Sequence, residues 1–92
     1  MEYYIIVKFK KDVNADEYHE PFKELFAQAE QIEGVKRADV FTTNTRTRNR
    51  FDLMIKISMK KSALKAFEES PLYKNWQNDY KDVIQKTTIF SC

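Results

Sequence analysis

The segment from Ser70 to Phe90, SPLYKNWQNDYKDVIQKTTIF, places the strongest constraint on how this chain folds. Ser70 followed by Pro71 predicts a helix start, because a serine oxygen accepts from a free N–H of the first turn and proline suits the first helical position. Residues 87–90 have the β-branched and aromatic composition of a strand. Between them, large apolar residues recur at helical spacing: Leu72, Trp76, Tyr80, Val83 and Ile84. The segment thus predicts a core, and leaves open whether that core encloses a pocket.

The 92 residues are expected to form one domain, residues 1–92. A net charge of +2 is too small to indicate a nucleic-acid or membrane partner, and no apolar run approaches the ~20 residues of a membrane span. No basic-then-apolar leader precedes the first predicted strand, and the single Cys92 suits a reducing cytoplasm. Because so short a chain buries only about 60–65% of its unfolded surface, association with a partner is expected.

Residues 2–10 alternate as a strand does, but neither face is purely polar. Tyr4 and Ile6 give the second face an apolar end, which indicates cover on both sides of the sheet. The third predicted strand, residues 51–57, alternates in the same way, with Met54 apolar on its outward face. The apolar face of the first strand is predicted to point into the core: Tyr3, Ile5, Val7 and Phe9.

A helix is predicted over residues 15–33, after a capping-box pattern formed by Asn14 and Glu17. Pro21 is expected to bend it, because an internal proline deletes one hydrogen bond and clashes with the preceding turn. The alternative is a loose turn over 14–20, with the regular helix beginning near Pro21. Gly34 suits the left-handed position that ends a helix.

A second strand (35–43), a polar hairpin connection (42–50) and a short helix (60–69) complete the order β-α-β-β-α-α-β. This order predicts an α+β, ferredoxin-like fold, in which a four-stranded antiparallel sheet carries its helices on one face. A homodimer is predicted, because a second copy is the simplest cover for the other face. The residues expected on that face are Tyr4, Ile6, Ala38, Val40 and Met54.

The sequence resembles the stress-responsive dimeric α/β-barrel (Dabb) family over residues 3–91. The similar parts are the opening strand IIVKFK, the turn IEGVK and the terminal stretch, which is similar to the family's His-Pro-x-His-x-x-Phe, a Tyr four residues on, and a closing Ile-Phe. The positions that match this terminal pattern are Pro71, Trp76, Tyr80, Ile89 and Phe90. The resemblance implies two subunits whose sheets face each other in a barrel, each with a pocket between its sheet and helices.

Some members of the family that this sequence resembles are polyketide cyclases, which use a histidine and a tyrosine for catalysis. This sequence departs from them at every histidine of that pocket, where it has Tyr3, Leu53, Ser70 and Tyr73, and at the helical tyrosine, where it has Phe67. A tyrosine with a pKa near 10 is a poor base at neutral pH. The departures argue against cyclase activity of that type and leave open whether the chain is an enzyme.

Two hypotheses follow for the aromatic cluster. In the first, it lines a pocket for a small apolar or aromatic ligand, any chemistry depends on Tyr73, Tyr3 and Tyr80, and no cofactor is needed. The cofactor-independent monooxygenases of the same superfamily are then the enzyme comparison, since Asn75 and Trp76 are residue types that they use. In the second, the rings fill the core of a non-catalytic dimeric protein. The pocket candidates are Tyr3, Tyr18, Phe22, Phe26, Leu53, Phe67, Tyr73, Trp76 and Tyr80.

The remaining polar residues predict no separate site. His19 is interpreted as a surface or boundary residue, and one histidine with one terminal cysteine makes no structural metal site. Arg46, Arg48 and Arg50 could grip an anion but are interpreted as solvated. RNA binding would require aromatic residues in a glycine-rich third strand, which residues 51–57 do not provide.

Overall fold

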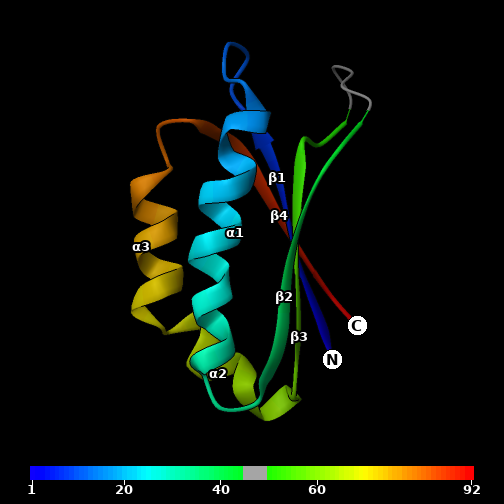
Figure 1. The fold of residues 1–92 in the computed structure, drawn as a ribbon, viewed down its shortest axis with the longest axis vertical. Helices are drawn as coiled ribbons and strands as arrows, with labels where there is room; N and C mark the ends of the chain where they lie inside the picture. The colour runs from blue at the N-terminus through cyan, green and yellow to red at the C-terminus, as the bar shows by residue number, and fades with distance from the viewer. Residues whose placement is uncertain (45–49) are drawn as a thin grey trace.

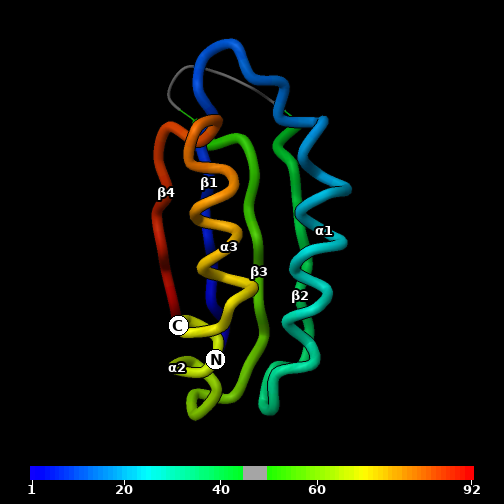
Figure 2. The backbone as a smooth tube through the Cα atoms, turned by 90° about the vertical axis from the view of Figure 1, so that its left-hand side faces the viewer, coloured from blue at the N-terminus to red at the C-terminus, as the bar shows by residue number. Residues whose placement is uncertain are grey.

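The computed structural model describes residues 1–44 and 50–92, and the four strands and three α-helices found there form two layers (Figure 1). The strands pair antiparallel in the order β2-β3-β1-β4. All helices lie on one face of the sheet, and α1 and α3 run side by side along it (Figures 1 and 2). The elements are β1 (Glu2–Phe9), α1 (His19–Ala27), β2 (Val35–Thr42), β3 (Leu53–Met59), α2 (Leu64–Glu68), α3 (Pro71–Asp79) and β4 (Ile84–Ser91). The predicted ferredoxin-like arrangement is confirmed.

The two central strands, β1 and β3, bury every second residue. Tyr3, Ile5 and Val7 of β1 stand directly opposite Ile57, Ile55 and Leu53 of β3, and all six point toward the helices. The predicted alternation is therefore correct in both strands, although β3 begins at Leu53, two residues later than expected. The opposite face of the sheet has no cover within the described chain (Figure 1).

The prediction that Ala38 and Val40 lie on the uncovered face is wrong. They stand opposite Ile57 and Ile55, whose side chains face the helices, and both pack against the core. The cause is a bulge at Lys36: Val35 pairs with Met59 but Arg37 pairs with Ser58, so the alternation shifts by one residue. The β2 residues on the uncovered face are instead Arg37, Asp39 and Phe41.

The first helical region is not one bent helix. A 3-10 turn over Ala15–Tyr18 leads into α1 at His19, and a second 3-10 turn, Gln28–Gln31, follows it. Pro21 is the third residue of α1, where its missing N–H would have had no intrahelical partner, so the helix needs no bend there. The predicted Ser70 cap is confirmed, since its hydroxyl oxygen accepts from the N–H of Tyr73. Asn14 also caps, but its side chain accepts from the N–H of Asp16 rather than from Glu17 as a capping box requires.

Gly34 connects this region to β2 with φ of +93°, which side chains rarely adopt. A Cβ at this position would lie 2.9 Å from the Cβ of Ala63 in the next helical segment. We expect Gly34→Ala to lower the free energy of unfolding by about 2 kcal/mol, because backbone strain and a steric clash add. Urea unfolding measures the loss, and an unchanged midpoint would show that the turn relaxes freely.

Candidate functional site

The uncovered face of the sheet carries a continuous apolar row. Phe41, Met54, Ile6 and Thr88 are successive cross-strand neighbours from β2 to β4. In the adjacent row Tyr4 pairs with Phe90, and their ring centroids lie 6.1 Å apart. Phe41 and Phe90 are 47% and 58% exposed, unusually high values for phenylalanine.

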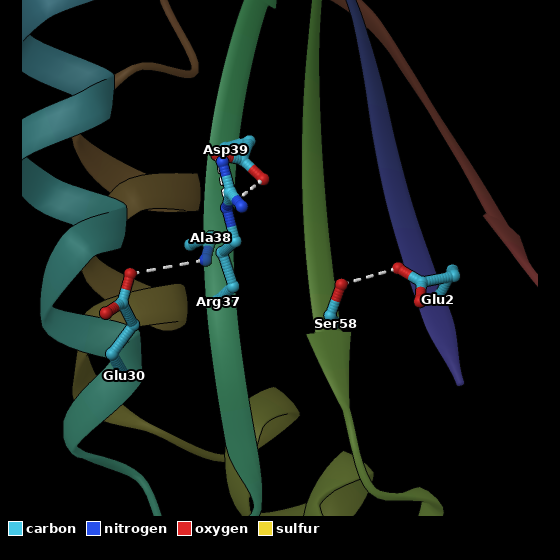
Figure 3. Close-up of polar contacts among 6 residues, drawn as sticks. All are labelled: Glu2, Glu30, Arg37, Ala38, Asp39 and Ser58. Atoms are coloured by element: carbon cyan, nitrogen blue, oxygen red, sulfur yellow. Dashed lines mark hydrogen bonds and ion pairs between the residues drawn. The ribbon is translucent and has the colours of Figure 1, made fainter.

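Polar residues close the row at the lower end of the sheet (Figure 3). The Ser58 hydroxyl donates to the Glu2 carboxylate at 2.7 Å, and the Arg37 guanidinium lies 2.9 Å from the Asp39 carboxylate. The charges of Arg37 and Asp39 are paired with each other, and Lys56 of β3 lies on the same face between Asp39 and Tyr4. The aromatic and aliphatic side chains above them are not covered. The face thus has an apolar centre beside a polar rim, which is the anatomy of a protein–protein interface.

The space between the sheet and the helices is filled with rings. Phe22 lies 4.7 Å from the Tyr80 ring and 5.7 Å from Trp76, and Trp76 stacks on Tyr73 at 6.0 Å, all between centroids. Phe67 bridges Tyr3 and Tyr73 at 5.4 and 4.9 Å. The predicted pocket candidates do lie together in one core, which also includes Leu53. Their rings pack against one another in pairs instead of lining an open pocket.

Two of the candidate tyrosines share a hydrogen-bonded network at the end of the core near α2. The Tyr3 hydroxyl donates to a carboxylate oxygen of exposed Glu68 at 3.0 Å, and its oxygen lies 3.5 Å from that of Tyr73. Burial is the main cause that raises the pKa of both hydroxyls above the ordinary value. At neutral pH both groups are protonated, so they can donate a hydrogen bond but cannot act as a general base.

The raised pKa values predict a specific alkaline behaviour. Burial raises both pKa values, so Tyr3→Phe combined with Tyr73→Phe should remove less tyrosinate absorbance from the folded protein at about pH 10 than the loss of two freely titrating tyrosines would. In the unfolded chain both lose their protons near pH 10, so rising pH favours unfolding, and stability falls above that pH. The double variant should flatten this fall in urea titrations. A loss of tyrosinate absorbance at about pH 10 as large as that of two freely titrating tyrosines would contradict the prediction.

Among the described residues, Trp76 carries the one buried side-chain nitrogen or oxygen atom without a hydrogen-bond partner. Its side chain is 1% exposed, and its indole Nε1–H has no hydrogen-bond partner. Trp76 also lines a groove of about 250 Å³ between α3 and β4, together with Gln77, Lys81, Ile84, Gln85, Lys86 and Thr87. A buried unpaired donor costs free energy, so a nearby acceptor would stabilise this region.

The other predicted polar residues lie apart from the aromatic core network. His19 is half-buried and its Nε2–H donates to the Val40 carbonyl at 3.1 Å, as expected for a boundary residue. Arg46 and Arg48 lie outside the described residues. Among those described, no three His, Cys, Asp or Glu side chains are placed to hold a metal ion. No described helix has the length and apolar character needed to cross a bilayer.

Sequence reasoning missed two features of these surfaces. Phe41 and Phe90 are exposed on the uncovered face, and Phe90 was identifiable because it alternates with Thr88 along a strand paired to Tyr4 and Ile6. The position of Phe41 on this face could not be predicted, because it depends on the bulge at Lys36, which no residue pattern in the sequence indicates. The Tyr3–Glu68 hydrogen bond joins residues 65 positions apart and was not predictable from spacing.

No family model and no curated protein matches the sequence. Among solved structures, the fold is similar to a dimeric ferredoxin-like protein of unknown function from Bacteroides fragilis (13% identity, TM-score 0.76, 97% of this chain and 90% of that one). A Dabb family protein from Mesorhizobium loti is also similar (11% identity, TM-score 0.61, 97% and 90%). So is a proposed antibiotic biosynthesis monooxygenase from Bacteroides thetaiotaomicron (16% identity, TM-score 0.71, 100% and 86%). The chain therefore has the ferredoxin-like fold that Dabb-type proteins share.

Proposed function

We propose that residues 1–92 act as one domain that forms a homodimer of the stress-responsive α/β-barrel type, with a filled aromatic core and no catalytic pocket. The two subunits pack the uncovered faces of their sheets together. The observation that carries this proposal is the apolar row of Phe41, Met54 and Ile6, flanked by Tyr4 and Phe90. Contiguous apolar patches of this kind mark interaction surfaces, and a twofold pair of identical patches is the commonest solution.

Two further observations support the proposal. The Bacteroides fragilis protein of the same fold is dimeric. The two buried tyrosine hydroxyls of the core, those of Tyr3 and Tyr73, are held protonated by burial, which disfavours acid–base chemistry at neutral pH. A cytoplasmic location belongs to the same proposal and rests on the single Cys92, which has no partner for a disulfide within the chain.

Sedimentation equilibrium and light scattering test this proposal on the unmodified protein. At micromolar concentration, we expect a mass of at least two chains, which falls on dilution as a mass-action equilibrium requires. A mass of one chain at all micromolar concentrations would refute it.

A second candidate function is the binding of a small carboxylic acid in the groove between α3 and β4. Trp76 lines this groove and its buried indole N–H has no acceptor, so a ligand carbonyl or carboxylate oxygen that reached it would supply one. Lys81 lines the same groove and adds positive charge, while Ile84 gives it an apolar side. The groove would accept an aromatic or short aliphatic acid, since a few polar groups on an apolar wall give orientation and specificity.

Trp76 is the only tryptophan of the chain, so its fluorescence reports directly on this groove. Benzoate and aromatic acetic acids should quench or shift the emission and raise the melting temperature. Lys81→Gln should weaken both effects about tenfold by removing one cation, while Lys65→Gln, on exposed α2, serves as the matched control. Identical responses of the two variants, or no response to any acid, would eliminate this function.

A further inference from the structure

Four side chains form a continuous series of contacts from the middle of the core to the surface. In order, they are Trp76, Tyr73, Tyr3 and Glu68. The Trp76 and Tyr73 rings stack, with centroids 6.0 Å apart and planes 8° from parallel. The Tyr73 and Tyr3 hydroxyl oxygens lie 3.5 Å apart, and the Tyr3 hydroxyl donates to a Glu68 carboxylate oxygen at 3.0 Å. The three aromatic residues are buried and Glu68 is exposed, so the series links an interior indole to solvent.

The ring contacts of Trp76 give an oxidised indole one direct electron donor. Among the described residues, its ring contacts those of Phe22, Phe26 and Tyr73. A phenol loses an electron far more readily than the phenyl ring of phenylalanine does. An electron that fills a vacancy on Trp76 therefore comes from Tyr73.

The unpaired indole N–H of Trp76 favours this electron transfer. An indole that has lost one electron is a radical cation, and in water it passes its N–H proton to solvent. At Trp76 this N–H is buried and has no acceptor, so the positive charge stays in an apolar core. A buried unpaired charge is costly, which makes the oxidised indole a stronger acceptor for an electron from its neighbour. A redox role also accounts for a buried donor that has no partner.

Tyr3 is the position in the series where a radical is most stable. A phenol gives up an electron readily only when its proton leaves as well, and burial raises the pKa of both tyrosine hydroxyls. Of the two, Tyr3 is hydrogen-bonded to a carboxylate, and the 3.0 Å separation is within the range for proton transfer. The electron vacancy should therefore move from Trp76 through Tyr73 and stop on Tyr3.

We propose that this series, the Trp76–Glu68 relay, carries one-electron oxidation out of the core. A small radical oxidant, such as a peroxyl or carbonate radical, enters the groove that Trp76 lines, takes one electron from the indole and leaves as its anion. Tyr73 then reduces Trp76, and Tyr3 reduces Tyr73 while its proton moves to the Glu68 carboxylate. A thiolate in solution supplies the missing electron and becomes a thiyl radical, and Glu68 returns the proton to Tyr3. The protein is unchanged by the cycle.

Pulse radiolysis of the unmodified protein in azide solution tests the relay, because azide radicals oxidise the single tryptophan. The visible absorbance of the tryptophan radical should be replaced by the tyrosyl band, and more slowly in D2O than in H2O because a proton moves as well. Tyr73→Phe keeps the ring and Glu68→Gln keeps the shape. Each should slow the conversion at least about tenfold, since one removes the intermediate donor and the other the proton acceptor. A tryptophan radical that decays without a tyrosyl band would overturn the proposal.

Two matched variants control for general effects of substitution. Glu69→Gln changes the exposed carboxylate next to Glu68, and Tyr80→Phe changes a tyrosine whose ring contacts Tyr18 and Phe22. Both should convert at the native rate. A rate for Glu68→Gln equal to that of Glu69→Gln, or a slowing by Tyr80→Phe equal to that by Tyr73→Phe, would refute the assigned route.

Steady radiolysis with glutathione present tests the protective effect. Peptide mass spectrometry should find oxidised Trp76 accumulating in Tyr73→Phe, and little in the native protein until the glutathione is consumed. Equal loss of Trp76 in the two proteins would overturn the proposal. Because the relay lies within one chain, its rates should be the same at all protein concentrations, so this inference and the proposed dimer fail independently.

Discussion

Replacing Phe22 with alanine should lower the free energy of unfolding by about 4 kcal/mol, within the usual range for a buried aromatic residue. Phe22 is fully buried on α1, and its ring contacts the rings of Phe9, Tyr18, Trp76 and Tyr80. The close-packed neighbours cannot collapse into the space that the ring leaves, so a cavity adds to the lost transfer free energy. For a small domain this loss is a large share of the total stability, and the variant should be partly unfolded near 37 °C.

Urea unfolding followed by circular dichroism measures this change in the free energy of unfolding. Lys23→Ala, the next residue on α1 and exposed, should change the stability by less than about 0.5 kcal/mol and provides the matched control. A small loss for Phe22→Ala would mean that the aromatic cluster is loosely packed. That result would favour the ligand pocket over the filled core, so the experiment also discriminates between the two hypotheses for the cluster.

The fold was predictable because its signals are local. Strand alternation in residues 2–9, the cap formed by Ser70 and the closing strand each follow from short-range chemistry. Element order then restricts the topology to very few arrangements. The bulge at Lys36 is also a local feature, but no residue pattern in the sequence indicates it. It places Ala38 and Val40 on the opposite face from the predicted one, because a one-residue shift moves every following side chain across the sheet.

The site was predictable only in part. The residues of the aromatic cluster were identified correctly, but ring spacing along a sequence cannot distinguish a lined pocket from a packed core, because that depends on distances of about 1 Å between elements. The hydrogen bonds of Tyr3 with Glu68 and of His19 with the Val40 carbonyl join distant segments. The indole N–H of Trp76 has no partner, which no spacing along the sequence could indicate. Each became visible only when the strands and helices were placed together.

The second large effect is expected on the uncovered face, where Ile6→Asp should halve the native mass. Ile6 lies at the centre of the sheet between Met54 and Thr88. Burial of an isoleucine contributes about 2 kcal/mol, and a twofold contact counts each change twice, so association should weaken at least about 1,000-fold. Ile6→Thr keeps the β-branched shape and should weaken association less, while Lys65→Glu on α2 should have no effect. Folded Ile6→Asp with the native mass would show that the apolar row is not an interface.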